Sequence, residues 1–199
     1  MAATTTAGAT RALPSAGGER PGNVLTVASL LLGAGGLMFF GTLVGAYVLL
    51  RSRLEPFPPE GASLDNYLGN MLVITIALSS ATVEWAYSAV RRGLRGQAAT
   101  AYGITAGLGL AFVNLLWFTA THADYGAGTH PYGTVVTLMA VALGILVGIG
   151  IAFAVLTAFR VAGEQVSAVD TDQARSLGWY WQFTVVASVA VWYTVVVLK

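Results

Sequence analysis

The sequence predicts an all-α integral membrane protein with five transmembrane helices. Of its 199 residues, 56% are hydrophobic and only 10% are charged, whereas soluble domains average about 25% charged residues. The mean hydropathy is +0.71. Five apolar segments each reach the roughly 20 residues that a helix needs to cross about 30 Å of hydrocarbon. We therefore expect lipid to be the main solvent of this chain.

The five apolar segments are separated by short polar connections. They cover residues 24–50, 68–90, 98–121, 134–159 and 178–198. They are apolar nearly all round, whereas the surface helices of soluble proteins carry one apolar stripe. We expect a single transmembrane domain over residues 24–199. Residues 1–23 are rich in Ala, Thr, Gly and Pro and lack an apolar run, so they are expected to form a disordered cytoplasmic tail.

The placement of basic residues predicts how the chain is oriented. Seven lie in the N-terminal tail and in the second and fourth connections, namely Arg11, Arg20, Arg91, Arg92, Arg95, Arg160 and Arg175. Three lie on the opposite side, namely Arg51, Arg53 and Lys199. Because cytoplasmic segments carry the excess of Lys and Arg, we expect the N-terminus in the cytoplasm and the C-terminus outside.

The composition excludes several kinds of chemistry within the chain. There are no cysteines and only two histidines, His122 and His130, both in the third connection. A buried haem or copper centre requires ligands that the spans lack. His122, Asp124 and His130 are interpreted as solvated loop residues, since they lack the helical spacing of a metal site. The net charge of +1 gives no basic field for nucleic acid. We expect no catalytic, cofactor-binding or metal site.

Glu84 is the one charged residue inside a predicted span. Ionisable residues at membrane depth are candidates for function. Glu84 precedes Arg91 by two helical turns, about 10 Å along the axis and on a similar face. Two interpretations follow: a structural acid that pairs with arginines near the inner interface, or a residue that serves a proton or subunit contact. Asn114 and Gln182 are expected to hydrogen-bond across helices.

Glycines at four-residue spacing predict positions where helices pack closely. They occur in the first, third and fourth spans as the pairs Gly41 and Gly45, Gly103 and Gly107, and Gly144 and Gly148. In lipid, close approach of two backbones supplies the dispersion contacts that hold helices together. We expect these glycines to form packing seams within the chain, with contact to another subunit as the alternative.

Short motifs occur in order along four of the five spans. The first span carries LMFFG (37–41), then Ala46, Tyr47 and a closing Arg51, and a proline-rich loop follows it. The later motifs are LSSAT (78–82), AVRRG (89–93), PYGTV (131–135), GIAF (150–153) and WYWQF (179–183). This ordered set resembles subunit III of the haem–copper oxidases, in the short five-helix form found in bacteria.

Several polar residues usual in that family are absent. Gly36 stands where the family has a buried glutamate, and aliphatic residues around Leu143 and Leu146 replace histidines. Gln182 replaces the histidine of the family's YYWHF motif, and Val185 replaces the aspartate three residues later. The chain therefore resembles a divergent member of the family.

The resemblance implies the non-catalytic subunit III of a bacterial aa3-type cytochrome c oxidase. Such a subunit is a multi-pass protein of the cytoplasmic membrane that packs against subunit I, with subunit II and small accessory subunits nearby, and binds phospholipid. Haem and copper belong to subunits I and II, so this chain would hold no cofactor. Trp179, Trp181 and Gln182 would form an inner-leaflet motif of the fifth helix.

Two other classes of function remain open. One is an accessory subunit of a quinol oxidase or a nitric oxide reductase, which belongs to the same superfamily. The other is a small membrane transporter or an assembly factor that acts outside any oxidase. A transporter usually carries polar residues near the midplane of several helices, and these spans carry few.

Overall fold

The computed structural model describes residues 24–54, 56–58, 65–122, 130–166 and 171–198. Its long helices are α1 (Val24–Arg51), α2 (Asn66–Arg91), α3 (Arg95–Thr121), α4 (Pro131–Ala162) and α5 (Asp172–Trp192), the last continued by a π-helical turn, η1 (Tyr193–Val197). All five are long and apolar enough to cross a membrane. The predicted all-α class and the five spans are confirmed. The predicted tail, Asp124 and Lys199 lie outside the described residues.

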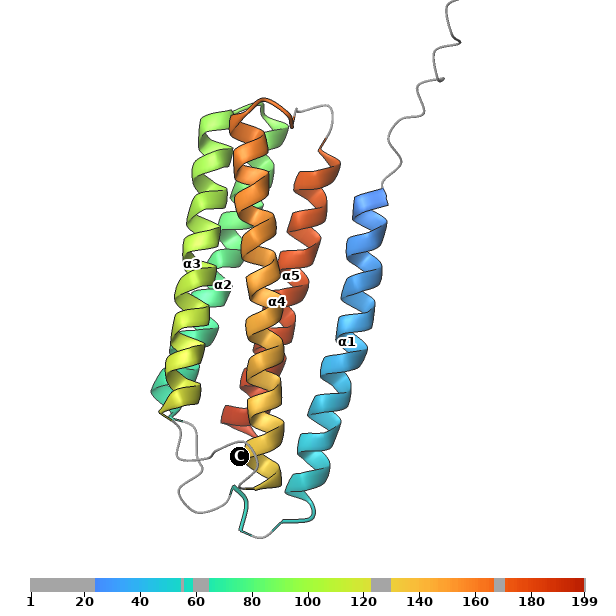
Figure 1. Ribbon diagram of the computed structural model, residues 1–199, viewed down its shortest axis with the longest axis vertical. Helices are drawn as coiled ribbons and strands as arrows, with labels where there is room; N and C mark the ends of the chain where they lie inside the picture. Colours follow the sequence, from blue (N-terminus) through green and yellow to red (C-terminus); the bar gives the residue numbers. More distant parts are fainter. Residues whose placement is uncertain (1–23, 55, 59–64, 123–129, 167–170, 199) are drawn as a thin grey trace, which may run out of the picture.

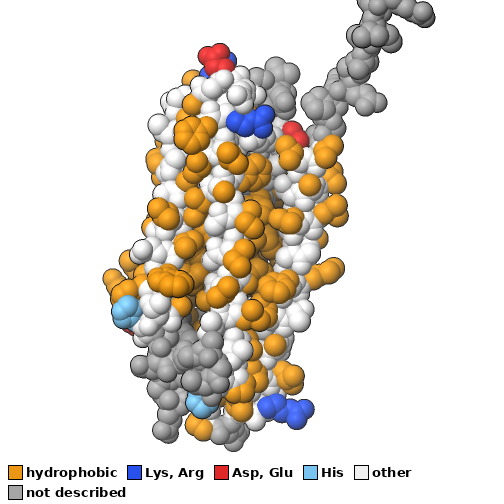
Figure 2. Space-filling view, viewed as in Figure 1, with side chains coloured by type: hydrophobic (Ala, Val, Ile, Leu, Met, Phe, Trp, Pro, Cys, Tyr) orange, Lys and Arg blue, Asp and Glu red, His pale blue; other side chains and the backbone are white. Residues whose placement is uncertain are grey.

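The helices lie side by side as one bundle with consecutive helices antiparallel (Figure 1). Helix α5 packs against α1, α2 and α4, while α3 packs against α2 and α4. Helix α1 lies at the edge of the bundle, against α5 and to a lesser extent α4. We call the end where α1 begins the Val24 end and the opposite end the Arg51 end. On the face in Figure 2, charged side chains lie near these two ends and hydrophobic ones cover the length between.

Local signals in the sequence fix where helices begin and end. The Asp65 carboxylate accepts a hydrogen bond from the Tyr67 backbone N–H at 2.9 Å and caps α2. At the other end of α2, Leu94 N donates to Ala89 O and Gly93 N to Val90 O. This is a Schellman motif, which needs a residue with positive φ, and Gly93 adopts φ 72°. The tight turn sends α3 directly back along α2.

The end of α4 has the same geometry with a different residue. Gln165 N donates to Arg160 O, and Glu164 N donates to Val161 O. Here Glu164 takes the left-handed position, with φ 62°, where glycine is favoured. The Glu164 carboxylate pairs with Arg95 at the start of α3. This ion pair joins the two connections at the Val24 end.

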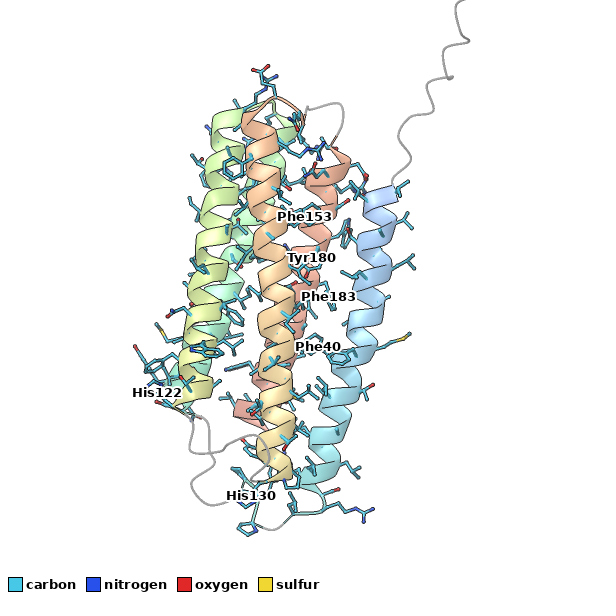
Figure 3. The ribbon with its side chains drawn as sticks, in the orientation of Figure 1. Phe40, His122, His130, Phe153, Tyr180 and Phe183 are labelled. Carbon is cyan, nitrogen blue, oxygen red and sulfur yellow. The ribbon has the colours of Figure 1, made fainter. Side chains whose placement is uncertain are left out.

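The buried apolar side chains form two clusters. The larger joins α2, α3, α4 and α5 and includes Ile76, Tyr102, Val147 and Trp181. The second joins α1 to α4 and α5 through residues such as Phe40. In Figure 3, Phe40 extends from α1 and Phe183 from α5 into the space between these helices. Helix α1 therefore docks mainly on α5, through aromatic and aliphatic side chains.

The predicted packing seams within the chain are wrong for the paired glycines. A Cβ added at Gly41, Gly45, Gly103, Gly107 or Gly148 would meet nothing within 4 Å. At Gly144 the nearest atom is Leu116 Cδ2 at 3.9 Å, an ordinary contact. Four-residue spacing places glycines on one helix face, but it does not say whether that face meets another helix. The alternative, contact with another subunit, stays a prediction.

Other glycines permit the close approaches within the bundle. A Cβ at Gly109 of α3 would lie 2.9 Å from Ile151 Cγ1 and from Trp181 Cη2. At Gly150 of α4 it would lie 2.9 Å from Trp181 Cζ3, and at Gly69 of α2 it would lie 2.7 Å from Val196 Cγ2. Each of these glycines leaves space for a large side chain of α5 or η1, so bulky residues of the last helix fill notches in its neighbours.

Candidate functional site

A row of hydrogen bonds joins α2 to α5 and runs from the buried core to the surface of the bundle. Trp181 Nε1 donates to Ser79 Oγ at 2.8 Å, and both side chains are fully buried. Ser80 Oγ donates to Gln182 Oε1 at 2.8 Å, and Gln182 Nε2 donates to Glu84 Oε1 at 3.1 Å. We call these five residues the α2–α5 polar seam. The interhelical bonding expected of Gln182 is confirmed.

Glu84 does not form the pairing with arginines that the structural interpretation of this residue expected. Its carboxylate is exposed and bonded to Gln182. Among the described residues the ion pair is Arg95 with Glu164, so neither Arg91 nor Arg92 pairs with Glu84. The Arg91 guanidinium lies over the Tyr87 ring, 6.0 Å from its centroid. The expected pairing is wrong because Arg91 turns toward Tyr87. A proton or subunit role for Glu84 stays a prediction.

A polar pocket opens beside Glu84 between α2 and α5. It is lined by Glu84, Tyr87, Arg175, Gly178, Trp179 and Gln182, and its empty volume, which includes open space, is about 560 Å³. Gly178 provides a wall without a side chain. An acid, a base, an amide and two aromatic rings therefore surround one hollow near the Val24 end.

The residues of the fifth-helix motif point in different directions. Trp179 is 47% exposed, whereas Trp181 is fully buried in the core. The buried Tyr180 donates its hydroxyl to the Leu146 backbone carbonyl at 2.7 Å. Because α5 begins at Asp172 and not at residue 178, the motif lies about two turns inside the helix. Its position in the inner leaflet stays a prediction.

Gly36, which stands where the oxidase subunit III family that the motifs resemble usually has a glutamate, faces the ring of Phe183. A Cβ at this position would contact Phe183 Cζ and lie 2.8 Å from Cε1. The ring of Phe183 thus fills the space that a side chain at position 36 would need. Gly33, one turn earlier, faces the same ring at 3.6 Å. These two glycines, spaced by three, were not among the predicted packing positions.

The two histidines lie apart from the polar seam, at the Arg51 end (Figure 3). The His122 ring stacks on Phe118, and its Nδ1 lies 3.0 Å from the Phe118 carbonyl oxygen. His130 precedes α4 and is exposed. Within the described ranges, no group of three or more His, Cys, Asp or Glu side chains could hold a metal ion.

An apolar pocket lies between α2, α3, α4 and α5 toward the Arg51 end. Its empty volume, open space included, is about 680 Å³, and its lining includes Leu72, Phe112, Ala140 and Val195. Three hydroxyl residues line it, Thr119, Thr137 and Ser188. Thr119 donates to Leu115 O and Ser188 to Thr184 O, so these two hydroxyls are satisfied by their own helices. Most of the wall is therefore apolar.

Some of the site was not predicted from the sequence. Ser79 and Ser80 were noticed only as part of a motif, and the structure makes them the α2 partners of Trp181 and Gln182. A signal existed, since two adjacent hydroxyls in an apolar span must bond either to their own helix or to a neighbour. Conversely, Asn114 is exposed and forms no hydrogen bond within the described chain, so the interhelical role expected of it is wrong.

Comparison with known proteins finds similarity to cytochrome c oxidase subunit 3 proteins. No family model matches the chain. The chain is 27% identical over 129 residues to cytochrome c oxidase subunit 3 of Paracentrotus lividus, covering 64% of this chain and 49% of the relative. For the subunit 3 of Thermostichus vulcanus the identity is 29% over 118 residues, covering 57% of each chain. For that of Pylaiella littoralis it is 26% over 175 residues, covering 83% and 61%. The chain thus spans about half to three fifths of these relatives.

Proposed function

We propose that the chain, which is similar to three cytochrome c oxidase subunit 3 proteins, is a divergent member of that family and the non-catalytic subunit III of a bacterial aa3-type cytochrome c oxidase. The observation that carries the proposal is the similarity to a subunit 3 over 175 residues, 83% of the chain. The five-helix bundle agrees with the short form of the family that the motifs resemble.

In this role the chain packs against subunit I in the cytoplasmic membrane, beside subunit II and small accessory subunits. The N-terminus lies in the cytoplasm, so the Val24 end faces inward. Haem and copper are held by subunits I and II, and oxygen is reduced in subunit I. Exposed apolar side chains along α1, such as Leu31 and Met38, support the proposal by offering a surface for lipid or for a neighbouring helix.

The second part of the role is phospholipid binding. The apolar pocket between α2, α3, α4 and α5 supports this part, because its open hydrocarbon-lined space suits an acyl chain. In the proposed orientation the pocket lies toward the outer leaflet. A lipid held there would fill a notch between four helices and stiffen the surface that meets subunit I.

Purification of the tagged chain from its own membranes in mild detergent tests the proposal. We expect a coloured complex with haem a spectra, and mass spectrometry should identify subunits I and II and the bound phospholipids. A lone colourless species would overturn it. A haem-bearing complex without haem a, or one that oxidises quinol, would instead favour a quinol oxidase or a nitric oxide reductase.

A further inference from the structure

Glu84 presents a carboxylate on the bundle surface, within a helix that is long and apolar enough to cross a membrane. It is exposed and lies seven residues before α2 ends at Arg91, which is about 10 Å along the axis at 1.5 Å per residue. An ionised carboxylate that faces acyl chains is strongly unfavourable, so such groups face a partner or a polar cavity.

The described chain satisfies this carboxylate only in part. Gln182 donates one hydrogen bond from a neutral amide to Oε1. The carbonyl of the same amide accepts from Ser80, so the hydrogen bond from Ser80 holds the amide with its donor side toward Glu84. No described residue donates to Oε2 of Glu84, and neither Arg91 nor Arg175 forms an ion pair with it. The carboxylate is therefore oriented but lacks a cationic donor.

The polar pocket has the shape and chemistry to admit such a donor. Gly178 leaves one wall open, and the rings of Tyr87 and Trp179 flank the hollow. Aromatic faces attract ammonium and guanidinium groups, and long basic side chains lay their methylene stems along apolar surface. Arg175 lies about two turns before Gln182 along α5, so it lines the pocket closer to the Val24 end than Gln182, the partner of Glu84.

We propose that this pocket receives a lysine or arginine side chain from a transmembrane helix of a neighbouring subunit. The basic group donates to Glu84 and neutralises it, and the apolar stem packs on Trp179. Two copies of this chain related by a two-fold axis through Glu84 would bring two carboxylates together, so the donor comes from a different chain. The inference rests on the proposed function in taking that neighbour to be an oxidase subunit.

Site-specific photocrosslinking in native membranes tests this inference on the full complex. The variant Trp179→p-benzoylphenylalanine places a reactive group at the pocket wall. We expect an adduct whose crosslinked peptide, mapped by mass spectrometry, is a transmembrane segment of another subunit that contains Lys or Arg. Adding Glu84→Gln, which keeps the shape but removes the charge, should lower the adduct yield about tenfold or more, because the ion pair at the contact is lost.

Two matched controls accompany the experiment. The same reactive group at Trp117, an exposed tryptophan of α3, should give adducts whose yield Glu84→Gln leaves unchanged. Glu164→Gln removes one negative charge outside the pocket and should leave the Trp179 adduct intact. Thermal unfolding of the purified complex checks that each variant is folded.

Several outcomes would overturn the inference: no protein adduct at Trp179, adducts only to lipid or to a second copy, or a yield unchanged by Glu84→Gln. The failures of the two proposals remain distinguishable. If Glu84→Gln lowers the adduct yield but the crosslinked subunit belongs to a complex without haem, the proposed oxidase role is wrong and the docking site stands. If haem-bearing subunits copurify but Glu84→Gln does not change the yield of the Trp179 adduct, the proposed docking site is wrong and the proposed oxidase role stands.

Discussion

Gly150 of α4 lies directly against the indole of Trp181 of α5, where an added Cβ would be 2.9 Å from Cζ3 and 3.1 Å from Cε3. Gly109 of α3 faces the same indole at 2.9 Å. Two helices thus approach α5 through the notches that these glycines leave, and Trp181 fills both. This fully buried tryptophan is the point where α3, α4 and α5 meet.

The first prediction concerns these notches. Gly150→Ala forces the indole to shift and should destabilise the bundle by about 1–3 kcal/mol, the usual cost of overpacking. Gly148→Ala is the matched control, since its Cβ meets nothing within 4 Å and alanine favours helix over glycine by about 1 kcal/mol. Thermal unfolding in detergent should show a lower midpoint for the first variant and an equal or higher one for the second. Equal losses would contradict the packing geometry.

The second prediction concerns the hydrogen bond between Trp181 and Ser79. Ser79→Ala leaves the indole N–H without its acceptor in a dry interior, which costs about 1–2 kcal/mol. A double-mutant cycle with Trp181→Phe should give a coupling of about 0.5–1.5 kcal/mol. Ser29→Ala, at a hydroxyl that bonds only to its own helix, should change stability by less than about 0.5 kcal/mol. Zero coupling would show that the bond contributes nothing.

The third prediction concerns the docking of α1. Gly36→Glu, which restores the usual family residue, should loosen α1 from α5 because the Phe183 ring occupies the required space. A milder loss of about 1–3 kcal/mol is expected for Gly36→Ala, and Phe183→Leu should recover part of it. Gly35→Ala is the control, as its Cβ meets nothing within 4 Å. If unfolding experiments find Gly36→Ala as stable as this control, the Phe183 ring does not restrict the size of the side chain at position 36.

The fourth prediction concerns the end of α4. Glu164→Gly removes a side chain from a left-handed position and should stabilise the chain by up to about 1 kcal/mol. Its exposed ion pair with Arg95 offsets little of this gain, because such pairs contribute about 0–1 kcal/mol. Glu164→Gln keeps the strained backbone and loses the charge, so it should be neutral or slightly destabilising. The unfolding temperature should therefore be higher for Glu164→Gly than for Glu164→Gln, and the reverse order would contradict the strain at this position.

The fifth prediction concerns the apolar pocket. Ala140→Phe places a ring in the space proposed for an acyl chain and should reduce the phospholipid retained after detergent purification, measured by mass spectrometry of extracted lipid. Ala34→Phe, at an exposed position of α1, adds the same ring outside the pocket and should leave lipid retention unchanged. Equal lipid content in both variants would place the bound lipid elsewhere.

The sequence alone determined the class of fold, the number of helices and most of their bounds. The reason is physical: a helix that crosses lipid needs about 20 apolar residues, so length and hydropathy suffice to find it. Ordered motifs such as LMFFG and WYWQF also indicated the resemblance to oxidase subunit III. Helix α5 began earlier than predicted because its first turns, from Asp172, are polar but still helical.

Only the tertiary structure decided which faces of these helices meet. Helical spacing is the same for a glycine whose added Cβ would meet no atom within 4 Å, such as Gly103, and for one that lies against a tryptophan, such as Gly150. Helical spacing likewise does not tell whether Arg91 or Gln182 is the partner of Glu84, because the partner depends on how α5 is rotated against α2. In a membrane protein, hydropathy marks the helices, while the fit of side chains between them sets their contacts.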